Sequence, residues 1–351
     1  MRDYRDSNVY REELQKILEQ YEIIDLLKGK IIAITGARGL IGSEIIDAVM
    51  MGNERYSLNC YVYAIVRNKE AAKERFREFL SSDLFELVQA DINSDEIQIE
   101  GDIDYFIHGA SNTHPVYYSA KPIETIMTNT LGTNNMLTFA SRHNCKRFLF
   151  LSSVEIYGEN TGETELFDEN YLGYINSNTL RAGYPEGKRV GETLCQAYMK
   201  ENNLDCVIAR ISRCYGPGLL KEDSKALSQF LNKACNGEDI VLKSKGEQYY
   251  SYVYVADVVS ALFFLLQSGE RGEAYNVTGD KSNITLADLA GLIARISEKK
   301  VIFELPDEME KAGYSKATKA LLDITKIKKL GWKSQYSIEE GIKRTLAMKG
   351  M

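Results

Sequence analysis

The chain has 351 residues, 44% of them hydrophobic and 26% charged, which is typical of a folded globular protein. That length suffices for two packed domains, or for one large α/β unit with an added lobe. The formal net charge of −7 argues against a general nucleic-acid-binding protein, and no apolar run approaches membrane-spanning length.

The cysteines are scattered and include no C-x-x-C pair, so we expect reduced, mostly buried thiols and no metal site. They are Cys60, Cys145, Cys195, Cys206, Cys214 and Cys235. The polar, charged start of the chain is unlike a secretory signal peptide. We therefore expect a cytoplasmic protein with neither nucleic acid nor membrane as a partner.

Residues 1–28 precede the first predicted strand. Apolar residues recur at helical spacing from Leu14 to Ile24, and Gly29 suits a helix C-cap. We predict a helical extension that packs on the body of the protein; a helix that binds a partner is the alternative.

From residue 30 onward, short apolar runs alternate with amphipathic stretches. Helices are expected at Leu40–Val49 and Lys69–Leu80. The predicted strands are Ile31–Thr35, Cys60–Val66, Phe85–Ala90, Tyr105–His108 and Phe148–Ser152. This alternation predicts an α/β fold with a Rossmann-type, doubly wound parallel sheet over residues 29–212.

The periodicity loosens after about Tyr215. Short strands at Asp239–Leu242 and Ala274–Val277 mix with a helix at Leu286–Ile296. We predict a smaller α/β substrate-binding lobe over residues 213–351, with residues 250–265 returning to the Rossmann domain. There is no low-complexity linker, so the two parts are expected to pack together.

The segment IIAITGARGLIG joins a predicted buried strand to a helix through Gly36, Gly39 and Gly42. Glycines permit a tight turn and close backbone approach, and a helix N-terminus attracts a pyrophosphate. The alternative is a tight β–α turn with no ligand. The predicted cofactor-binding residues are Gly36, Arg38, Gly39, Leu40, Ile41, Gly42, Arg67, Asp91, Ile92, Ala110 and Lys188.

Arg67 leaves the choice between NAD and NADP open. An NAD site usually has Asp or Glu at the end of the second strand, where this chain has Arg67. Arg67, with Arg38 or Lys69, would suit the 2′-phosphate of NADP; the alternative is an arginine stacked on adenine or solvated. Asp91 is placed to accept a hydrogen bond from the adenine amine.

Tyr184 and Lys188 lie four residues apart and therefore on one face of a helix. Oxidation of an alcohol needs a base for the hydroxyl proton while hydride leaves for nicotinamide. A tyrosine with a reference pKa of about 10 is a poor base at neutral pH. A neighbouring ammonium and the positive nicotinamide favour its phenolate. The pair predicts an enzyme that oxidises an alcohol.

Ser152 and Ser153 follow a predicted parallel strand, at the edge where ligands of such sheets bind. A serine there can polarise the developing ketone. Glu155 is a candidate acid or base, or else a solvated loop carboxylate.

These motifs resemble the extended short-chain dehydrogenase/reductases, the NAD-dependent nucleotide-sugar epimerase/dehydratase family. TGARGLIG, FIHGAS, NTLGTNNML, LSSVEIYG, YPEGK, ARISRCYGPG, YVYVADVV, AYNVTG and LGW occur in the family's order. The segments SNTHPVYYSAKPIETIMTNTLGT and LRAGYPEGKRVGETLCQAYMK are most similar to UDP-glucuronate decarboxylases.

The resemblance implies catalytic roles for Ser153, Tyr184 and Lys188, with Glu155 as acid or base. It also implies that Asn129 supports the active-site helix and that the helices flanking the serine-bearing strand form a homodimer bundle. The substrate-binding residues that follow from it are Thr113, Ser153, Glu155, Arg213, Lys225 and Tyr250.

The chain departs from the family pattern at several pocket positions. Val154 replaces a hydroxyl or carboxyl residue, Tyr250 stands where an arginine is usual, and Arg213 where an asparagine is usual. A diphosphate-binding role is thus expected to have moved to Arg213, aided by Lys225.

We expect transient oxidation of a nucleotide-linked sugar or polyol through a keto intermediate, followed by epimerisation or decarboxylation. The alternatives are a nucleotide-sugar 4,6-dehydratase, an NADPH-dependent keto-sugar reductase, and a non-catalytic dinucleotide sensor.

Overall fold

The computed structural model describes residues 3–94, 96–111, 113, 120–160, 162–219, 223, 225–304 and 318–350. Its centre is a seven-stranded sheet in which every neighbouring pair is parallel, in the order β10-β6-β5-β4-β1-β2-β3. The strands are β1 (Ile31–Thr35), β2 (Tyr61–Val66), β3 (Phe85–Gln89), β4 (Tyr105–His108), β5 (Arg147–Ser153), β6 (Cys206–Ile211) and β10 (Ala274–Val277). The strand order reverses direction between β1 and β4, as in the Rossmann fold.

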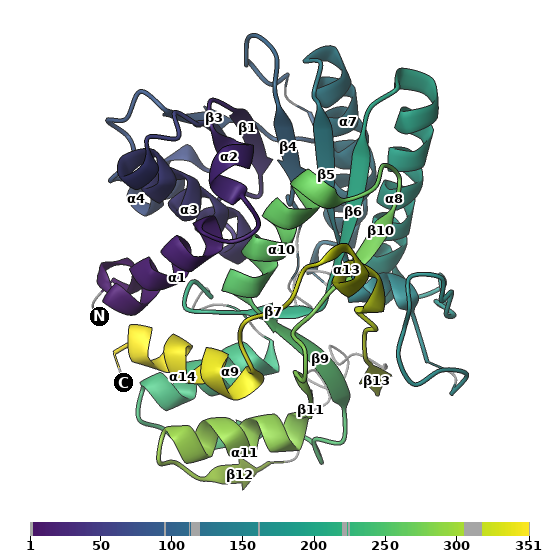
Figure 1. The fold of residues 1–351 in the computed structure, drawn as a ribbon. Coiled ribbons are helices and arrows are strands. Elements are labelled where there is room, and N and C mark those ends of the chain that lie inside the picture. Colours follow the sequence, from purple (N-terminus) through teal and green to yellow (C-terminus); the bar gives the residue numbers. More distant parts are fainter. Residues whose placement is uncertain are drawn as a thin grey trace.

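Helices cover both faces of this sheet (Figure 1). The two faces are separate apolar layers: Ile32 and Ile34 of β1 belong to one, and Ala33 between them to the other. The first layer includes α3 (Leu40–Tyr56) and α10 (Val255–Ser268). The second includes α7 (Thr133–Arg142) and the long α8 (Gly183–Asn202). Burial on both faces explains why these strands read as continuous apolar runs.

Shorter elements lie between the main ones. Those of the first half are α4 (Lys69–Arg75), α6 (Pro122–Met127), the π-helical turn η2 (Thr128–Gly132), η3 (Val154–Tyr157) and η4 (Leu180–Ala182). Because α6 and η2 pack on α8, they form one helical unit with it.

The C-terminal part has its own small sheets, in which β9 pairs with β7, β11 and β13, and β8 pairs with β12. Its strands are β7 (Arg213–Tyr215), β8 (Ile240–Leu242), β9 (Tyr249–Tyr254), β11 (Asn283–Thr285), β12 (Val301–Phe303) and β13 (Lys319–Ala320). Its helices are α9 (Ala226–Cys235), α11 (Leu286–Ile296), α13 (Thr325–Leu330) and α14 (Ile338–Met348).

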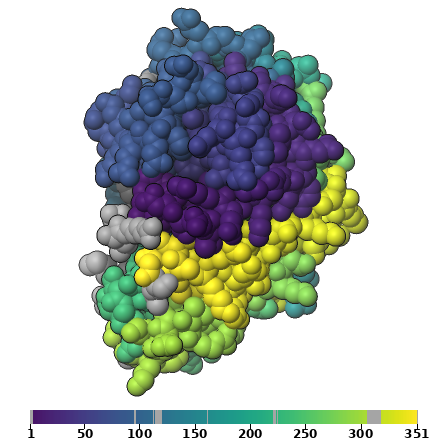
Figure 2. All heavy atoms as spheres, turned by 60° about the vertical axis from the view of Figure 1, so that its left-hand side comes forward, coloured from purple at the N-terminus to yellow at the C-terminus, as the bar shows by residue number. Residues whose placement is uncertain are grey.

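The N-terminal extension forms η1 (Tyr4–Asp6), α1 (Asn8–Leu18) and α2 (Ile23–Leu27). It is not one helix, because Tyr21 and Glu22 adopt left-handed backbone angles, with φ of +50° and +56°. Figure 2 shows its purple atoms between the blue atoms of the residues that follow in the chain and the yellow C-terminal residues. The extension therefore packs on the body of the protein, as its apolar spacing predicts.

The structure matches the predicted strands closely and corrects two other expectations. β1 and β4 have the predicted bounds, whereas α4 ends at Arg75 instead of Leu80. Ala274–Val277, expected in the smaller lobe, is β10 and pairs with β6 at the edge of the central sheet. Sheet partners depend on long-range packing, which a local pattern does not encode.

Three negative findings concern the described residues. No helix there has both the length and the apolar character needed to cross a membrane. No cluster of three or more His, Cys, Asp or Glu side chains that could bind a metal is found there. All six cysteines are free thiols, four of them buried.

Candidate active site

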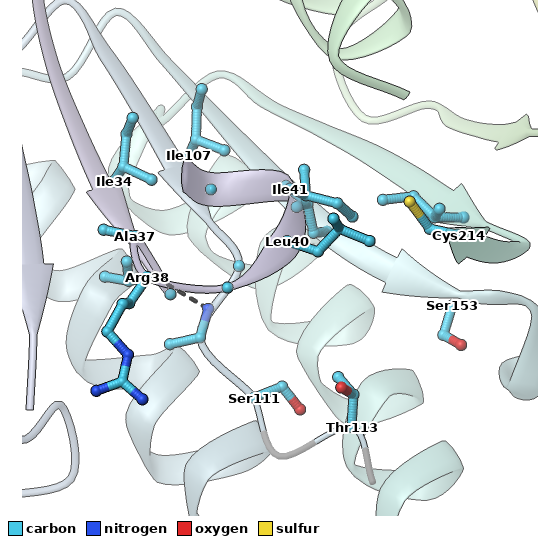
Figure 3. A pocket seen from close by; sticks show the side chains of 18 of the residues that line it. Ile34, Ala37, Arg38, Leu40, Ile41, Ile107, Ser111, Thr113, Ser153 and Cys214 are labelled. Atoms are coloured by element: carbon cyan, nitrogen blue, oxygen red, sulfur yellow. Dashed lines mark hydrogen bonds between the residues drawn. The ribbon is translucent and has the colours of Figure 1, made fainter. Parts of the chain in front are cut away.

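A cavity of about 660 Å³ opens at the carboxyl ends of β1, β2, β4, β5 and β6, where ligands of open parallel sheets bind. It is lined by Gly36, Gly39 and Gly42 of the loop after β1, and by Tyr184 and Lys188. The other predicted site residues that line it are Arg38, Leu40, Ile41, Arg67, Asp91, Ile92, Ala110, Thr113, Ser153, Glu155, Arg213 and Lys225. Figure 3 shows Arg38 on one side of this pocket and Ser153 with Thr113 on the other.

The loop between β1 and α3 is built so that only glycine fits. Gly36 has φ +70°, and a Cβ there would lie 2.6 Å from the carbonyl oxygen of Gly109. A Cβ on Gly42 would lie 2.5 Å from the carbonyl oxygen of Gly36. Gly39 is the N-cap of α3, so the free N–H groups of this helix start at the cavity. These residues fit the pyrophosphate of a dinucleotide.

A buried chain of hydrogen bonds supports the loop from below. The Ala110 N–H donates to Thr35 Oγ1 at 3.2 Å, and Thr35 Oγ1 lies 2.7 Å from His108 Nδ1. His108 Nε2 lies 3.1 Å from Thr133 Oγ1, which donates to the Asn129 carbonyl. Burial, helped by the charge of Lys188, lowers the pKa of His108 to about 3, so its ring is neutral. The sequence analysis named Ala110 and Asn129 but not the three side chains that link them, which are far apart in sequence.

Arg67 lies at the cavity edge but is ion-paired. Its Nη1 atom is 2.6 Å from Oε1 of Glu124, a residue of α6. Asp91, across the same end of the pocket, accepts a hydrogen bond from the Asn93 N–H at 3.0 Å. The predicted free cation for a 2′-phosphate is therefore balanced by a carboxylate.

Tyr184 is buried at the start of α8, beside Ser153. Burial and the charge of Glu155 raise the pKa of Tyr184, whereas a hydrogen bond with Ser153 and the charge of Arg181 lower it. The net effect raises the pKa, so the protein alone holds a neutral phenol. The lowered pKa that the sequence predicted needs positive charge from a bound ligand.

Lys188 lies one turn further along α8 and is 3% exposed. Its ammonium donates to the carbonyl oxygen of Leu151 at 2.8 Å, which ties α8 to the end of β5. Burial lowers the pKa of Lys188 to about 8, and Glu192 and Cys195 act in the opposite direction. Lys188 is therefore mostly protonated at neutral pH.

Glu155 is an ion-paired carboxylate rather than a solvated one. Its side chain is 26% exposed, and Arg181 Nη2 donates to Oε1 at 2.7 Å. Burial raises the pKa of Glu155, but the charges of Arg181, Arg213 and Lys225 bring it below its usual value. Sequence reasoning missed Arg181. Its position three residues before Tyr184, on the same helical face, was the available signal.

Arg213 and Tyr250 form a stacked pair. The Arg213 guanidinium carbon lies 3.4 Å from the centre of the Tyr250 ring. Tyr250 is buried under it and does not line the cavity, so this predicted substrate-binding residue supports Arg213 instead. Arg213 Nη1 is buried and has no hydrogen-bond partner among the described residues. Such a donor is suited to an anionic ligand.

The sequence of the region containing these elements identifies a family. The family model described as the NAD dependent epimerase/dehydratase family matches residues 32–278, which include the glycine loop and the Tyr184/Lys188 pair. The chain belongs to this family.

Relatives within the NAD-dependent epimerase/dehydratase family agree over most of the chain. UDP-glucuronic acid decarboxylase 1 of Xenopus tropicalis is 32% identical, covering 96% of this chain and 77% of its own length. UDP-glucuronic acid decarboxylase 5 of Arabidopsis thaliana is 31% identical, covering 89% of this chain and 86% of its own length. This chain is accordingly an enzyme of the family.

Solved structures share the fold. UDP-glucose 4-epimerase from Thermotoga maritima has a TM-score of 0.75 at 22% identity, covering 91% of this chain and 98% of the other. UDP-glucuronic acid 4-epimerase from Bacillus cereus, in complex with UDP-glucuronic acid and NAD, has a TM-score of 0.75 at 19% identity, with the same coverages. The resemblance to the family, and the Rossmann-type fold that it implies, are thus confirmed.

The two serines at the end of β5 have different surroundings in this member of the epimerase/dehydratase family. Ser152 Oγ donates to Glu192 Oε1 at 2.5 Å, and Glu192 also pairs with Arg210 at 2.7 Å. Ser153 instead interacts with Tyr184, and its Oγ accepts a hydrogen bond from the Glu155 N–H at 3.2 Å. The Glu192–Arg210 pair, which sequence reasoning missed, anchors α8 to β6 beneath the site.

Proposed function

We propose that this enzyme transiently oxidises a hydroxyl group of a nucleotide-linked sugar with NAD, giving a keto-sugar that reacts further before the ketone is reduced again. The observation that carries the proposal is that Ser153, Tyr184 and Lys188 line the same cavity as the three glycines of the loop after β1. When bound, NAD supplies a hydride acceptor and, on its oxidised ring, a positive charge. That charge would favour the phenolate that this step needs.

Each residue of the catalytic set has a distinct task in the proposal. Tyr184 takes the hydroxyl proton, and Ser153 donates a hydrogen bond to the same oxygen as it becomes a ketone. Lys188, buried and bonded to the Leu151 carbonyl oxygen, holds a positive charge one turn further along α8 than Tyr184. Each task reverses when the ketone is reduced.

The cations around Glu155 support an anionic substrate. Arg181, Arg213 and Lys225 all act on this carboxylate, and Lys225 also pairs with Asp223 at 3.7 Å, so three cations meet two carboxylates among these residues. Arg213 presents a buried nitrogen without a partner among the residues described. A sugar diphosphate supplies the anion that Arg213 and Lys225 would bind, and a uronic acid would add a second anion.

Decarboxylation of a nucleotide-linked uronic acid is the second step that we propose. It is the activity named for the two relatives described above, which are 32% and 31% identical to this chain. A ketone at C4 lies β to the carboxylate on C5, so carbon dioxide can leave while the ketone accepts the electron pair. Epimerisation is the second candidate, favoured by Val154, whose side chain cannot donate a hydrogen bond to a carboxylate.

Incubation with a panel of nucleotide sugars, read by mass spectrometry and chromatography, tests the proposal. Loss of carbon dioxide indicates a decarboxylase, and a new peak of equal mass indicates an epimerase. Tyr184→Phe should reduce turnover by about 10²- to 10⁴-fold, because general acid–base catalysis contributes that much, while NAD still binds. Full activity of Tyr184→Phe would contradict the assignment of the base.

We propose further that two copies of the chain pair through the α6–α8 face. The apolar side chains exposed on α6, η2 and α8 are Ile123 (77%), Ile126 (41%), Met127 (39%), Leu131 (37%) and Val190 (43%). An apolar group of this kind on one surface is typical of an interface.

Free thiols at all six cysteines support a reducing, cytoplasmic setting.

A further inference from the structure

The chain lacks the acidic residue that usually recognises the ribose of NAD at the end of the second strand, since Arg67 stands there. In the structure a carboxylate from another element nevertheless pairs with this arginine. Glu124 of α6, distant in sequence, places Oε1 2.6 Å from Arg67 Nη1. Its other oxygen is 3.5 Å from Lys121 Nζ.

Charge decides what this pairing does. An arginine at the end of the second strand attracts the 2′-phosphate of NADP, which carries nearly two negative charges. Glu124 engages that guanidinium and so competes with a phosphate for it. The Glu124 side chain is 27% exposed and that of Arg67 is 53% exposed, so the carboxylate is the more buried partner. The ribose 2′-hydroxyl of NAD has no charge, so its binding does not depend on that cation.

We propose that Glu124 is a specificity-determining residue: through its ion pair with Arg67 it makes the pocket select NAD over NADP. This inference rests on the proposed function only in requiring that the cavity bind a dinucleotide. It assigns to α6 a role in cofactor choice that the sequence around the glycine loop does not reveal.

Titration calorimetry of the full-length chain, freed of bound nucleotide and at fixed ionic strength, tests this with NAD and NADP. Glu124→Gln should strengthen NADP binding by about tenfold, the effect of releasing one close cation for a phosphate. NAD binding should change by less than about threefold, because the dinucleotide's shared contacts are kept. Mass spectrometry of the nucleotide that co-purifies with each variant gives an independent measure.

Two controls isolate the pair. Lys121→Gln removes a second cation near Glu124 but leaves the Arg67 pair, so NADP binding should not strengthen. The double variant Arg67→Ala/Glu124→Gln should not bind NADP tenfold more tightly than Arg67→Ala alone. In both variants the arginine that Glu124 would release is absent. Arg38 is present in every variant, so its own contribution cancels.

The outcomes separate the two proposals. If the unaltered chain binds NAD but Glu124→Gln leaves NADP affinity unchanged, this inference is overturned and the proposed function stands. An equal gain in the Arg67→Ala background would also overturn it, since the effect would then not act through Arg67. If neither dinucleotide binds the unaltered chain, both proposals fail.

Discussion

Gly36 shows how a single residue position controls the cofactor site. Its φ of +70° lies in the left-handed region, and a side chain there would meet the Gly109 backbone at the end of β4. Two backbone segments thus approach at the floor of the cavity, and a substitution would push them apart.

Gly36→Ala should weaken NAD binding by at least about tenfold, because the strained backbone and the clash with Gly109 distort the loop. Gly291→Ala is the matched control: nothing lies within 4 Å of its added Cβ, and Gly291 sits within α11. That change should leave binding intact and raise stability by about 0.5–1 kcal/mol. Calorimetry and thermal melts measure both effects. Equal losses of NAD binding in the two variants would refute the special role of Gly36.

The helix α8 is the element that organises the catalytic residues. Tyr184, Lys188 and Glu192 recur every four residues and face the strand ends. Its glycines permit close packing: a Cβ on Gly187 would lie 2.8 Å from Asn129, and one on Gly191 would lie 2.5 Å from Phe150. The support from Asn129 that the family resemblance implied is therefore a direct contact.

The helix α1 connects the two parts of the molecule through a buried carboxyl group. Glu13 is fully buried; Tyr254 donates to Oε2 at 3.0 Å and Arg344 donates to Oε1 at 3.2 Å. Glu44 and Asp47 of α3 lie in the same buried region, and Asp47 binds Tyr10 at 2.6 Å. Burial raises the pKa of Glu13 to about 7, and its bonds to Tyr254 and Arg344 only partly offset this.

This raised pKa predicts a pH dependence of stability. Between pH 4.5 and about 7 the folded state holds a proton on Glu13 that the unfolded chain has released. The free energy of unfolding should therefore fall as pH rises through this range, by up to about 3 kcal/mol. Glu13→Gln should remove that part of the dependence. Denaturant unfolding of both proteins from pH 4.5 to 8 measures it, and parallel curves would contradict the assignment.

The whole molecule is a Rossmann-type sheet with a second layer of small sheets beneath its carboxyl edge (Figure 1). β7, which follows directly on β6, carries Arg213 to the cavity, and β9 carries Tyr250 to support it. The glycine loop and Arg213 therefore reach the cavity from different layers, so their relative placement depends on how the layers pack.

Assembly of two copies through α6–α8 predicts a specific sensitivity to charge. Ile123→Glu should shift the protein from dimer to monomer, because a buried, unpaired carboxylate at the interface is costly. Leu172→Glu is the control, since Leu172 is 83% exposed but lies outside these helices. Size-exclusion chromatography with light scattering distinguishes the masses. A monomeric unaltered chain, or dissociation by both variants, would contradict the proposed face.

The sequence alone was sufficient for features that depend on local order. The glycine spacing, the alternation of strands and helices, and the four-residue separation of Tyr184 and Lys188 each predict geometry within one short segment, and the structure has that geometry. Buried parallel strands and a helix face are determined by their own residue period.

Only the tertiary structure decided the charges around the site. Glu124 forms an ion pair with Arg67, and Arg181 forms one with Glu155. Tyr250 lies under Arg213 instead of lining the cavity. The same holds for β10, which pairs with β6 in the central sheet. Such partners are far apart in sequence or belong to different elements. No local periodicity encodes which of them meet, because their contacts arise only when the layers pack.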